Sequence, residues 1–495
     1  MAQSTETLVE THLFIGGEWQ PSASGRQYEV RNPAFPDEVV GQAAQADKED
    51  VERAVRAAHD AFPAWSALSF SERAEYLRKI AEHVVADKED LDSRIHLFTR
   101  EHGKILREST LEMTRLGDRF VYCASQADRL ATDEKLTAPP FDTIITRQPR
   151  GVAALIVPWN WPLSILGAKL PQALISGNTV VIKPAQQAAL APCLTLKLMG
   201  SLLPPGVMNV VTGASSEIGD PLLAHPLVRK INFTGGIETG KHVMRVAADG
   251  LKHVTLELGG NDAAIVLDDA DITEETLRRM VMGTFATSGQ ICMAIKRIYV
   301  HKSQYQELLK GYTDITDQYV IGNGLDSQVT MGPLNNKAQL DIVREFLEEA
   351  RERGANVNEV GKIADEEVYR KGYFQRPAIV TDADHSMKIV ADEQFGPAIP
   401  IMPFDTEDEV IEMANDTEFG LCSSVWTREP ERALKVARRL EAGYTYLNGH
   451  GPMAQDNRAP FGGFKKSGIG RNLGYEGILE FMEPHSISGP AGWLF

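Results

Sequence analysis

The chain has few cysteines and no long apolar run. Its only cysteines, Cys123, Cys193, Cys292 and Cys422, lie far apart without a C-x-x-C pair. This spacing excludes a disulfide framework and a clustered zinc site, and no other group of His, Cys and Asp has ligand spacing, so we expect no metal and a reducing, cytoplasmic compartment. No stretch approaches the about 18 apolar residues of a membrane span. The first residues lack the basic and apolar regions of an export signal, so we expect neither export nor a membrane partner.

The sequence also lacks an excess of positive charge. Its 51 Lys and Arg residues face 68 Asp and Glu residues, which gives a net charge of −17, and no basic cluster is present. Binding a polyanion requires a basic surface, so we expect no nucleic-acid partner. With 43% hydrophobic and 24% charged residues, the composition is that of an ordinary globular protein, and 495 residues suffice for two or three domains.

The order of apolar and polar stretches indicates an α/β protein. Residues 47–130 show helical periodicity, and residues 131–150 alternate polar and apolar side chains like a β-hairpin leaving the main body. From residue 151 to 258, short apolar strands alternate with helices, and a second alternation runs from residue 263 to 447. We therefore predict two doubly wound parallel-sheet domains with the ligand site between them, and a small β arm for assembly.

One cysteine has a position suited to chemistry. Residues 272–285 predict a helix, Ser288 and Gly289 end it, and a strand follows at Arg297. Cys292 is thereby placed in a helix-to-strand turn, where backbone N–H groups can stabilise a thiolate or an adjacent oxyanion. Because most cysteines are small core residues, the placement alone does not identify a nucleophile.

Four further motifs accompany this turn. They are Pro158-Trp159-Asn160-Trp161-Pro162, Lys183-Pro184-Ala185, Leu256-Glu257-Leu258-Gly259-Gly260 and Glu393-Gln394-Phe395-Gly396-Pro397. With these motifs, in this order over nearly its whole length, the chain resembles the NAD(P)-dependent aldehyde dehydrogenase superfamily. The resemblance implies a cofactor-binding domain of residues 1–130 and 149–256, a catalytic domain of residues 257–465, and an oligomerisation arm and tail of residues 131–148 and 466–495. It also implies oxidation of a small-molecule aldehyde with NAD or NADP by a homodimer or homotetramer.

Three residues carry the chemistry that the resemblance implies. Cys292 would attack the aldehyde carbon, and the Asn160 amide with the Cys292 N–H would stabilise the oxyanion that results. Pro158 and Pro162 restrict the backbone around Asn160, which suits a fixed donor. Glu257 would activate water to hydrolyse the thioester left after hydride transfer. A carboxyl group in an apolar strand is costly to bury, and a role as general base accounts for it.

The resemblance places the cofactor near a second group of residues. The glycines at 235 and 236 lie between a strand and a helix whose N-terminus suits a pyrophosphate, although the usual G-x-G-x-x-G fingerprint is absent. A lysine after a strand would reach ribose or phosphate oxygens, a glutamate would bind the nicotinamide ribose, and a phenylalanine would pack near the ring. The full set is Trp159, Lys183, Gln186, Gly235, Gly236, Glu393 and Phe395.

The chain departs from the family pattern at several positions. Gln186 replaces a carboxylate that usually contacts the adenosine ribose, which removes repulsion toward a 2′-phosphate and predicts appreciable use of NADP. Gly236 replaces a serine, Asn261 replaces a lysine, and Asn472 replaces a carboxylate that relays protons with the base. The nucleophile, the oxyanion donor and the base are retained, so we expect an active enzyme with an altered cofactor preference and proton route.

The substrate is inferred from positions that match the family's tunnel. The residues flanking the thiol are Trp161, Ile165, Ala168, Ile291 and Met293. Most are apolar and Ala168 is small, so we expect a wide apolar tunnel for a bulky or aromatic aldehyde. Arg115 is expected near the tunnel mouth, where it would instead hold the carboxylate of a semialdehyde.

Two other functions remain open. A CoA-acylating semialdehyde dehydrogenase would pass the acyl group to a thiol, and Glu257 argues against this because thiolysis needs no water-activating base. A catalytically idle structural protein on the same fold would not need the nucleophile, oxyanion donor and base together. For assembly, the apolar tail Trp493-Leu494-Phe495 is expected to make subunit contacts together with the arm.

Overall fold

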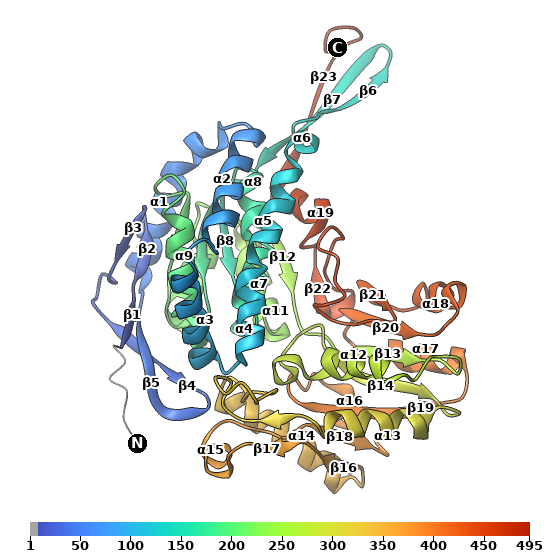
Figure 1. The fold of residues 1–495 in the computed structure, drawn as a ribbon. Helices are drawn as coiled ribbons and strands as arrows, with labels where there is room; N and C mark the ends of the chain where they lie inside the picture. The colour runs from blue at the N-terminus through green and yellow to red at the C-terminus, as the bar shows by residue number, and fades with distance from the viewer. Residues whose placement is uncertain (1–7) are drawn as a thin grey trace.

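The computed structural model describes residues 8–495, which form two large sheets and a projecting arm (Figure 1). The first sheet has eight strands in the order β22-β12-β11-β8-β9-β10-β2-β3. Its parallel central strands are β8 (Val152–Ile156), β9 (Thr179–Lys183), β10 (Met208–Val210), β11 (Val228–Thr234) and β12 (His253–Glu257). Its antiparallel edge strands are β2 (Leu13–Ile15), β3 (Glu18–Gln20) and β22 (Gly468–Ile469). The first predicted parallel sheet is confirmed.

Helices cover both faces of this sheet. One face carries α1 (Lys48–Ser66), α10 (Ser215–Ala224) and α11 (Ile237–Asp249). The other carries α2 (Phe70–His83), α3 (Lys88–His102), α5 (Leu116–Ser125), α8 (Leu170–Ile175) and α9 (Ala191–Gly200). The predicted helical layer begins sharply because Asp47, Ser69 and Asp87 accept hydrogen bonds from first-turn N–H groups of α1, α2 and α3.

The second sheet has seven strands in the order β16-β18-β19-β14-β13-β20-β21, all parallel except the edge strand β16 (Asn356–Glu359). The others are β13 (Asp262–Val266), β14 (Ile295–His301), β18 (Ala378–Thr381), β19 (Ala398–Phe404), β20 (Cys422–Trp426) and β21 (Tyr444–Leu447). One face packs against α12 (Glu274–Phe285) and α13 (Tyr305–Thr316), and the other against α14 (Lys337–Glu352), α16 (Lys388–Ala391), α17 (Glu407–Asn415) and α18 (Pro430–Ala437). The second doubly wound sheet is therefore also confirmed.

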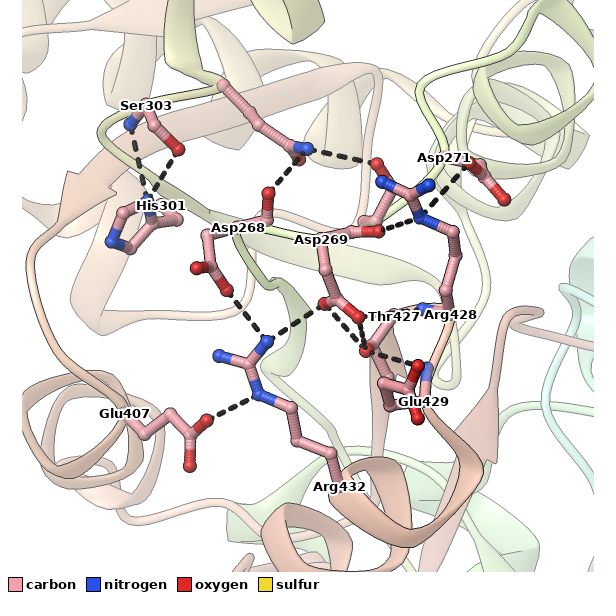
Figure 2. Close-up of polar contacts among 12 residues, drawn as sticks. Asp268, Asp269, Asp271, His301, Ser303, Glu407, Thr427, Arg428, Glu429 and Arg432 are labelled. Carbon is pink, nitrogen blue, oxygen red and sulfur yellow. Dashed lines mark hydrogen bonds and ion pairs between the residues drawn. The ribbon is translucent and has the colours of Figure 1, made fainter.

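An ion-pair network fastens the end of β13 to two helices of the second sheet (Figure 2). The Arg432 guanidinium on α18 lies 2.7 Å from Oδ1 of Asp268 and 3.0 Å from Oδ1 of Asp269, and it donates to Glu407 on α17. The Thr427 hydroxyl, just after β20, also donates to Asp269. Because a network of several charges holds its geometry better than an isolated surface pair, these contacts tie α17 and α18 to the segment after β13.

The arm has three strands, one more than the sequence predicted. The expected hairpin is β6 (Glu134–Ala138) and β7 (Phe141–Pro149), and the tail strand β23 (Met482–Pro490) pairs antiparallel with β7 along its length. Figure 1 shows the arm projecting from the body with the C-terminus near its tip. The tail strand was missed because its sequence contains proline and glycine, which are depleted in strands.

Smaller elements complete the described chain. They are β1 (Val9–Thr11), β4 (Gln27–Asn32), β5 (Phe35–Ala44), β15 (Val320–Ile321), β17 (Lys362–Ile363), α4 (Leu106–Thr114), α6 (Ala127–Leu130), α7 (Pro162–Gly167), α15 (Glu366–Lys371) and α19 (Gly474–Leu479). Within residues 8–495, none of the helices combines the length and apolar character needed to span a bilayer.

The two large sheets meet at opposite ends of their strands. β12 ends at Glu257 and β13 begins at Asp262, so the carboxyl end of the first sheet adjoins the amino end of the second. Gly260 lies between them, and a Cβ there would come within 2.6 Å of the Cys292 carbonyl oxygen, so the close approach requires glycine. The exact domain bounds stay a prediction. The passage of the chain from the first sheet to the second between Glu257 and Asp262 supports a boundary at this point.

Candidate active site

The turn before Cys292 contains three consecutive residues in the left-handed conformation. After α12, Thr287 (φ 52°), Ser288 (φ 55°) and Gly289 (φ 74°) form the 3-10 turn η2 (Ala286–Gly289). Such a backbone costs about 1–3 kcal/mol for each non-glycine residue, so surrounding contacts must hold it. A Cβ at Gly289 would lie 2.3 Å from the Gly396 carbonyl oxygen, which leaves room only for glycine.

Buried polar side chains supply these contacts. The Thr287 N–H donates to Oε1 of Glu108 across 2.6 Å. Gln290 is buried, and its Nε2 donates to the Thr287 carbonyl oxygen while its Oε1 accepts from the Asn335 N–H, each across 2.9 Å. The backbone leading to Cys292 is therefore fixed before a substrate binds.

The Cys292 thiol is partly buried among charged groups. Burial raises the pKa of Cys292 well above its usual range, and the charge of Glu257 raises this pKa further. The ammonium of Lys296 acts in the opposite direction and donates to the Cys292 carbonyl oxygen across 2.7 Å. Since the thiolate is the nucleophile, the thiol needs a neighbouring cation or base to become reactive.

Asn160 lies in the loop between β8 and α7 and is 3% exposed. Its Nδ2 donates to the Gln290 carbonyl oxygen across 3.0 Å, which ties the loop to the Cys292 turn. The N-terminus of α7 is held by Glu112, whose Oε1 accepts from the N–H groups of Leu163 (2.8 Å) and Ser164 (2.9 Å). These contacts give the amide a fixed place beside the thiol, as an oxyanion donor requires.

Glu257 sits in a hydrogen-bonded network and is 5% exposed. Its Oε2 accepts from the Asn472 amide (3.0 Å) and the Thr234 hydroxyl (3.2 Å) and lies 3.9 Å from Nζ of Lys169. Asn232 completes the network, since it donates to Oδ1 of Asn472 (2.8 Å) and accepts from Nζ of Lys169 (2.6 Å). The carboxylate therefore has hydrogen-bond partners, although Glu257 is the last residue of a buried strand.

Two cavities meet at Asn160 and Cys292, which line both. The larger, of about 270 Å³, is also lined by Trp159, Gly235, Gly236, Glu393 and Phe395. The smaller, of about 60 Å³, is also lined by Trp161, Ile165, Ala168, Ile291, Met293 and Glu257. The thiol thus lies between two compartments, and the larger one includes the glycine backbone of residues 235 and 236.

The lining of the larger cavity suits the pyrophosphate and nicotinamide parts of a dinucleotide. Gly236 is the N-cap residue of α11, no side chain caps this helix, and a Cβ at Gly236 would meet open space, so the free N–H groups can hold a pyrophosphate. Glu393 accepts from the Gly260 N–H across 3.1 Å, and as a wall residue it can accept ribose hydroxyls. The rings of Trp159 and Phe395 meet edge to face, with centroids 5.6 Å apart, and form an aromatic wall.

Two predicted cofactor residues lie outside the walls of this cavity. Lys183 ends β9 in register with Ile156 of β8, at the same edge of the sheet as the Asn160 loop, and burial lowers its pKa to about 8. Nε2 of Gln186 lies 3.4 Å from Oε1 of Gln45. Their roles toward the adenosine half of the cofactor stay predictions.

The smaller cavity contains all five apolar residues predicted to flank the thiol. Arg115, expected near its mouth, is instead exposed at the junction of α4 and α5 and does not line the cavity. Arg119, one helical turn further along α5, lines it. The prediction of Arg115 was therefore wrong by one helical turn, because residues four apart share a helix face and both are arginine.

Arg119 enters the cavity beside small residues of α7. A Cβ at Gly167 would already come within 3.2 Å of Cδ of Arg119, so a larger residue at 167 would displace it. The guanidinium donates to the Ser164 carbonyl oxygen, which is its one hydrogen bond within the described chain. Since a guanidinium has five N–H donors, the others remain available to a ligand.

Several site residues were missed from the sequence. Glu108 and Gln290 support the turn, Arg119 lines the substrate cavity, and Lys296 contacts the backbone of Cys292. Arg119 could have been considered from the sequence, because it lies four residues after Arg115 and so on the same helix face. Lys296 also had a signal in the sequence, because a lysine between the apolar residues of a helix-to-strand connection and a buried strand needs a buried partner.

Comparisons with known proteins agree with this geometry. Residues 19–487 match the model of the aldehyde dehydrogenase family. The chain is 37% identical to a chloroplastic betaine aldehyde dehydrogenase of Beta vulgaris, over 98% of each protein, and 36% identical to a glutarate-semialdehyde dehydrogenase of Pseudomonas putida, over 96% of this chain and 97% of that protein. A crystal structure of a Staphylococcus aureus betaine aldehyde dehydrogenase point mutant in complex with NAD+ superposes with a TM-score of 0.92, at 34% identity over 98% of each chain.

A matched family model across the chain and relatives above 30% identity over nearly full length define the class of this protein. The chain therefore belongs to the aldehyde dehydrogenase family and is an NAD(P)-dependent enzyme of that family.

Proposed function

We propose that this enzyme oxidises a bulky, uncharged and preferably aromatic aldehyde to its carboxylic acid. The wall of the smaller cavity carries the proposal, because Trp161, Ile165, Ile291 and Phe461 present apolar surface beside the thiol. Ala168 also lines this cavity, and its small side chain leaves more room for a substrate than a larger residue would. An apolar cavity favours an apolar ligand and excludes water from the reacting group.

The residues of the site support a covalent route. After the Cys292 thiol has released its proton to solvent, the thiolate Sγ bonds to the aldehyde carbon as the carbonyl π bond opens. The Asn160 amide donates to the oxygen that takes the negative charge. When bound in the larger cavity, NAD or NADP supplies the hydride acceptor that turns the thiohemiacetal into a thioester. Glu257 then takes a proton from a water that attacks the acyl carbon, which releases the acid and restores the thiol.

Glu257 also supports hydrolysis over transfer to a thiol such as CoA. Two hydrogen bonds, from Asn472 and Thr234, orient its carboxylate within the substrate cavity. An oriented carboxylate next to the acyl group is what activation of water requires, whereas a thiol is already a good nucleophile near neutral pH.

A semialdehyde that carries a carboxylate is the second candidate, and Arg119 favours it. Its guanidinium lines the cavity and has N–H groups to spare, and a guanidinium binds carboxylates in bidentate fashion. The relative from P. putida is named for such a substrate. Betaine aldehyde, which carries a permanent positive charge, is disfavoured because this arginine would repel it.

For assembly and location, we propose a homodimer or homotetramer in a reducing, cytoplasmic compartment. The arm and tail expose Phe141 (55%) and Trp493 (79%), and a partner subunit that covers them would remove apolar surface from water. Four free cysteines support a reducing compartment. A monomeric mass by light scattering at micromolar concentration would refute the assembly.

A substrate panel tests the proposed function. Benzaldehyde, acetaldehyde and succinic semialdehyde are compared by kcat/KM with NAD and with NADP. Benzaldehyde is expected to be best. A clear preference for succinic semialdehyde would favour the second candidate, and a preference for acetaldehyde would contradict both.

A further inference from the structure

Lys296 is a buried cation beside the reactive turn. It is the second residue of β14 and is 3% exposed. Its ammonium donates to the carbonyl oxygens of Ile291 and Cys292, each across 2.7 Å, so it holds the peptide groups on both sides of Cys292. The resemblance to the family and the assigned mechanism give this lysine no task.

The same ammonium reaches the cofactor cavity. Nζ of Lys296 lies 3.5 Å from Oε1 of Glu393, which lines that cavity. Oε1 of Glu393 also accepts from the Gly260 N–H across 3.1 Å. The strand backbone is held in turn, because Nε2 of Gln394 donates to the Lys296 carbonyl oxygen across 3.1 Å. An ammonium has three donors, and here they face the two carbonyl oxygens at 2.7 Å, the more distant carbonyl oxygen of Ala294 at 3.5 Å and the Glu393 carboxylate.

We propose that Lys296 is a positioning residue that ties the Cys292 turn to Glu393, so that one buried ammonium holds the nucleophile and the carboxylate facing the cofactor. The proposal rests on the roles proposed above for Cys292 and Glu393. It explains why a lysine occupies a buried strand position, where an apolar side chain would avoid the cost of burying a charge.

The contact of Lys296 with the Cys292 turn also has an electrostatic effect on the thiol. The groups that face Cys292 are the acids Glu257, Asp262 and Glu393, the cations Lys169 and Lys296, and the thiol of Cys422. The three acids raise the pKa of Cys292, and Lys296 lowers it. Lys296 also lowers the pKa of Glu393, which burial raises. The same ammonium therefore favours thiolate at Cys292 and the charged form of Glu393.

The test measures the rate of alkylation of Cys292 by iodoacetamide as a function of pH, read by peptide mass, in Lys296→Met. Loss of the cation is expected to move the midpoint up by about one pH unit, which is a tenfold loss of thiolate. The dissociation constant of NAD, by calorimetry, is expected to rise about fivefold as Glu393 loses its partner. A role confined to packing would move neither quantity.

Matched variants make the result specific. Lys302→Met removes an exposed lysine just after the same strand and is expected to change neither quantity. Lys296→Arg keeps the charge and is expected to leave the midpoint within about half a unit of wild type. If Lys296→Met does not fold, Lys296→Gln retains a donor without the charge and is expected to show the same upward shift.

An unchanged midpoint together with unchanged NAD affinity, in a folded Lys296→Met or Lys296→Gln enzyme, would overturn the proposal. Failure of the underlying function gives a different result. If Cys292→Ala still oxidises aldehyde, Cys292 is not the nucleophile, and this outcome does not depend on any Lys296 variant.

Discussion

The side-chain amide of Asn472 donates a 3.0 Å hydrogen bond to Oε2 of Glu257. An amide has no titratable proton near neutral pH, so Asn472 can orient Glu257, the proposed base, but cannot carry its proton away. Lys169 has its Nζ 3.9 Å from the same oxygen, and burial lowers its pKa to about 8. Of these two neighbours of the base, Lys169 is therefore the one that can exchange a proton.

Replacing Asn472 by leucine should slow deacylation. The change removes the hydrogen bond while keeping a similar volume, and a hydrogen bond to a charged group contributes about 1.5–3 kcal/mol. We expect steady-state turnover to fall at least about tenfold with a normal first burst of NADH, because Cys292 is untouched. Stopped-flow absorbance separates the two phases. Equal loss of burst and steady state would show that Asn472 acts before the thioester forms.

Gln186 is expected to permit NADP, and Gln186→Glu should shift the preference toward NAD. A carboxylate beside the 2′-phosphate would repel it, so KM for NADP should rise about tenfold while KM for NAD changes little. Initial rates with each cofactor measure this. Gln187→Glu, at the exposed next position, is the matched control. A wild-type enzyme that rejects NADP outright would show that another residue sets the preference.

Two variants of the smaller cavity test the two candidate substrates separately. Ala168→Trp fills the wall and should reduce kcat/KM for benzaldehyde by about ten- to hundredfold more than for acetaldehyde. Arg119→Met should leave benzaldehyde oxidation within a few-fold of wild type, with the exposed Arg115→Met as control. A different pair of results would establish the second candidate substrate instead. In that case the wild-type enzyme would oxidise the semialdehyde fastest, and Arg119→Met would lose this activity.

Cofactor binding should weaken above pH 8. Because burial lowers the pKa of Lys183 to about 8, its ammonium is charged below that pH and neutral above it. The attraction to cofactor phosphate is lost as the pH rises through this value, and we expect the dissociation constant of NADP to increase about tenfold from pH 7 to 9.5. Calorimetry across this range should give a flatter profile for Lys183→Met. Parallel profiles for the two proteins would assign the pH dependence to another group.

Much of the fold was predictable because its signals are local. Apolar runs that alternate with helical periodicity predicted both parallel sheets, and Ser288 and Gly289 marked the end of the helix before Cys292. The third strand of the arm was not predictable, because β23 pairs with β7 over more than 300 positions of the chain, and nothing in its own composition favours a strand.

Proximity of the site residues was predictable where residue type and motif coincide: Cys292, Asn160 and Glu257 line one cavity, and their catalytic roles stay predictions. Its supports depend on contacts between distant segments. Asn472 reaches Glu257 from the far end of the chain, and Arg119 rather than Arg115 lines the cavity because it lies one turn further along α5. A sequence pattern does not encode which side of a helix meets a particular loop.

The most direct test of the covalent mechanism is the intact mass of Glu257→Gln enzyme after brief mixing with NAD and benzaldehyde. Without the base, the thioester should accumulate, so we predict one added acyl group for each subunit, mapped to Cys292, with a normal first burst of NADH. Cys292→Ala should show neither adduct nor burst. An unmodified Glu257→Gln enzyme that turns over at the wild-type rate, or a Cys292→Ala enzyme that retains more than about a hundredth of wild-type activity, would contradict the mechanism.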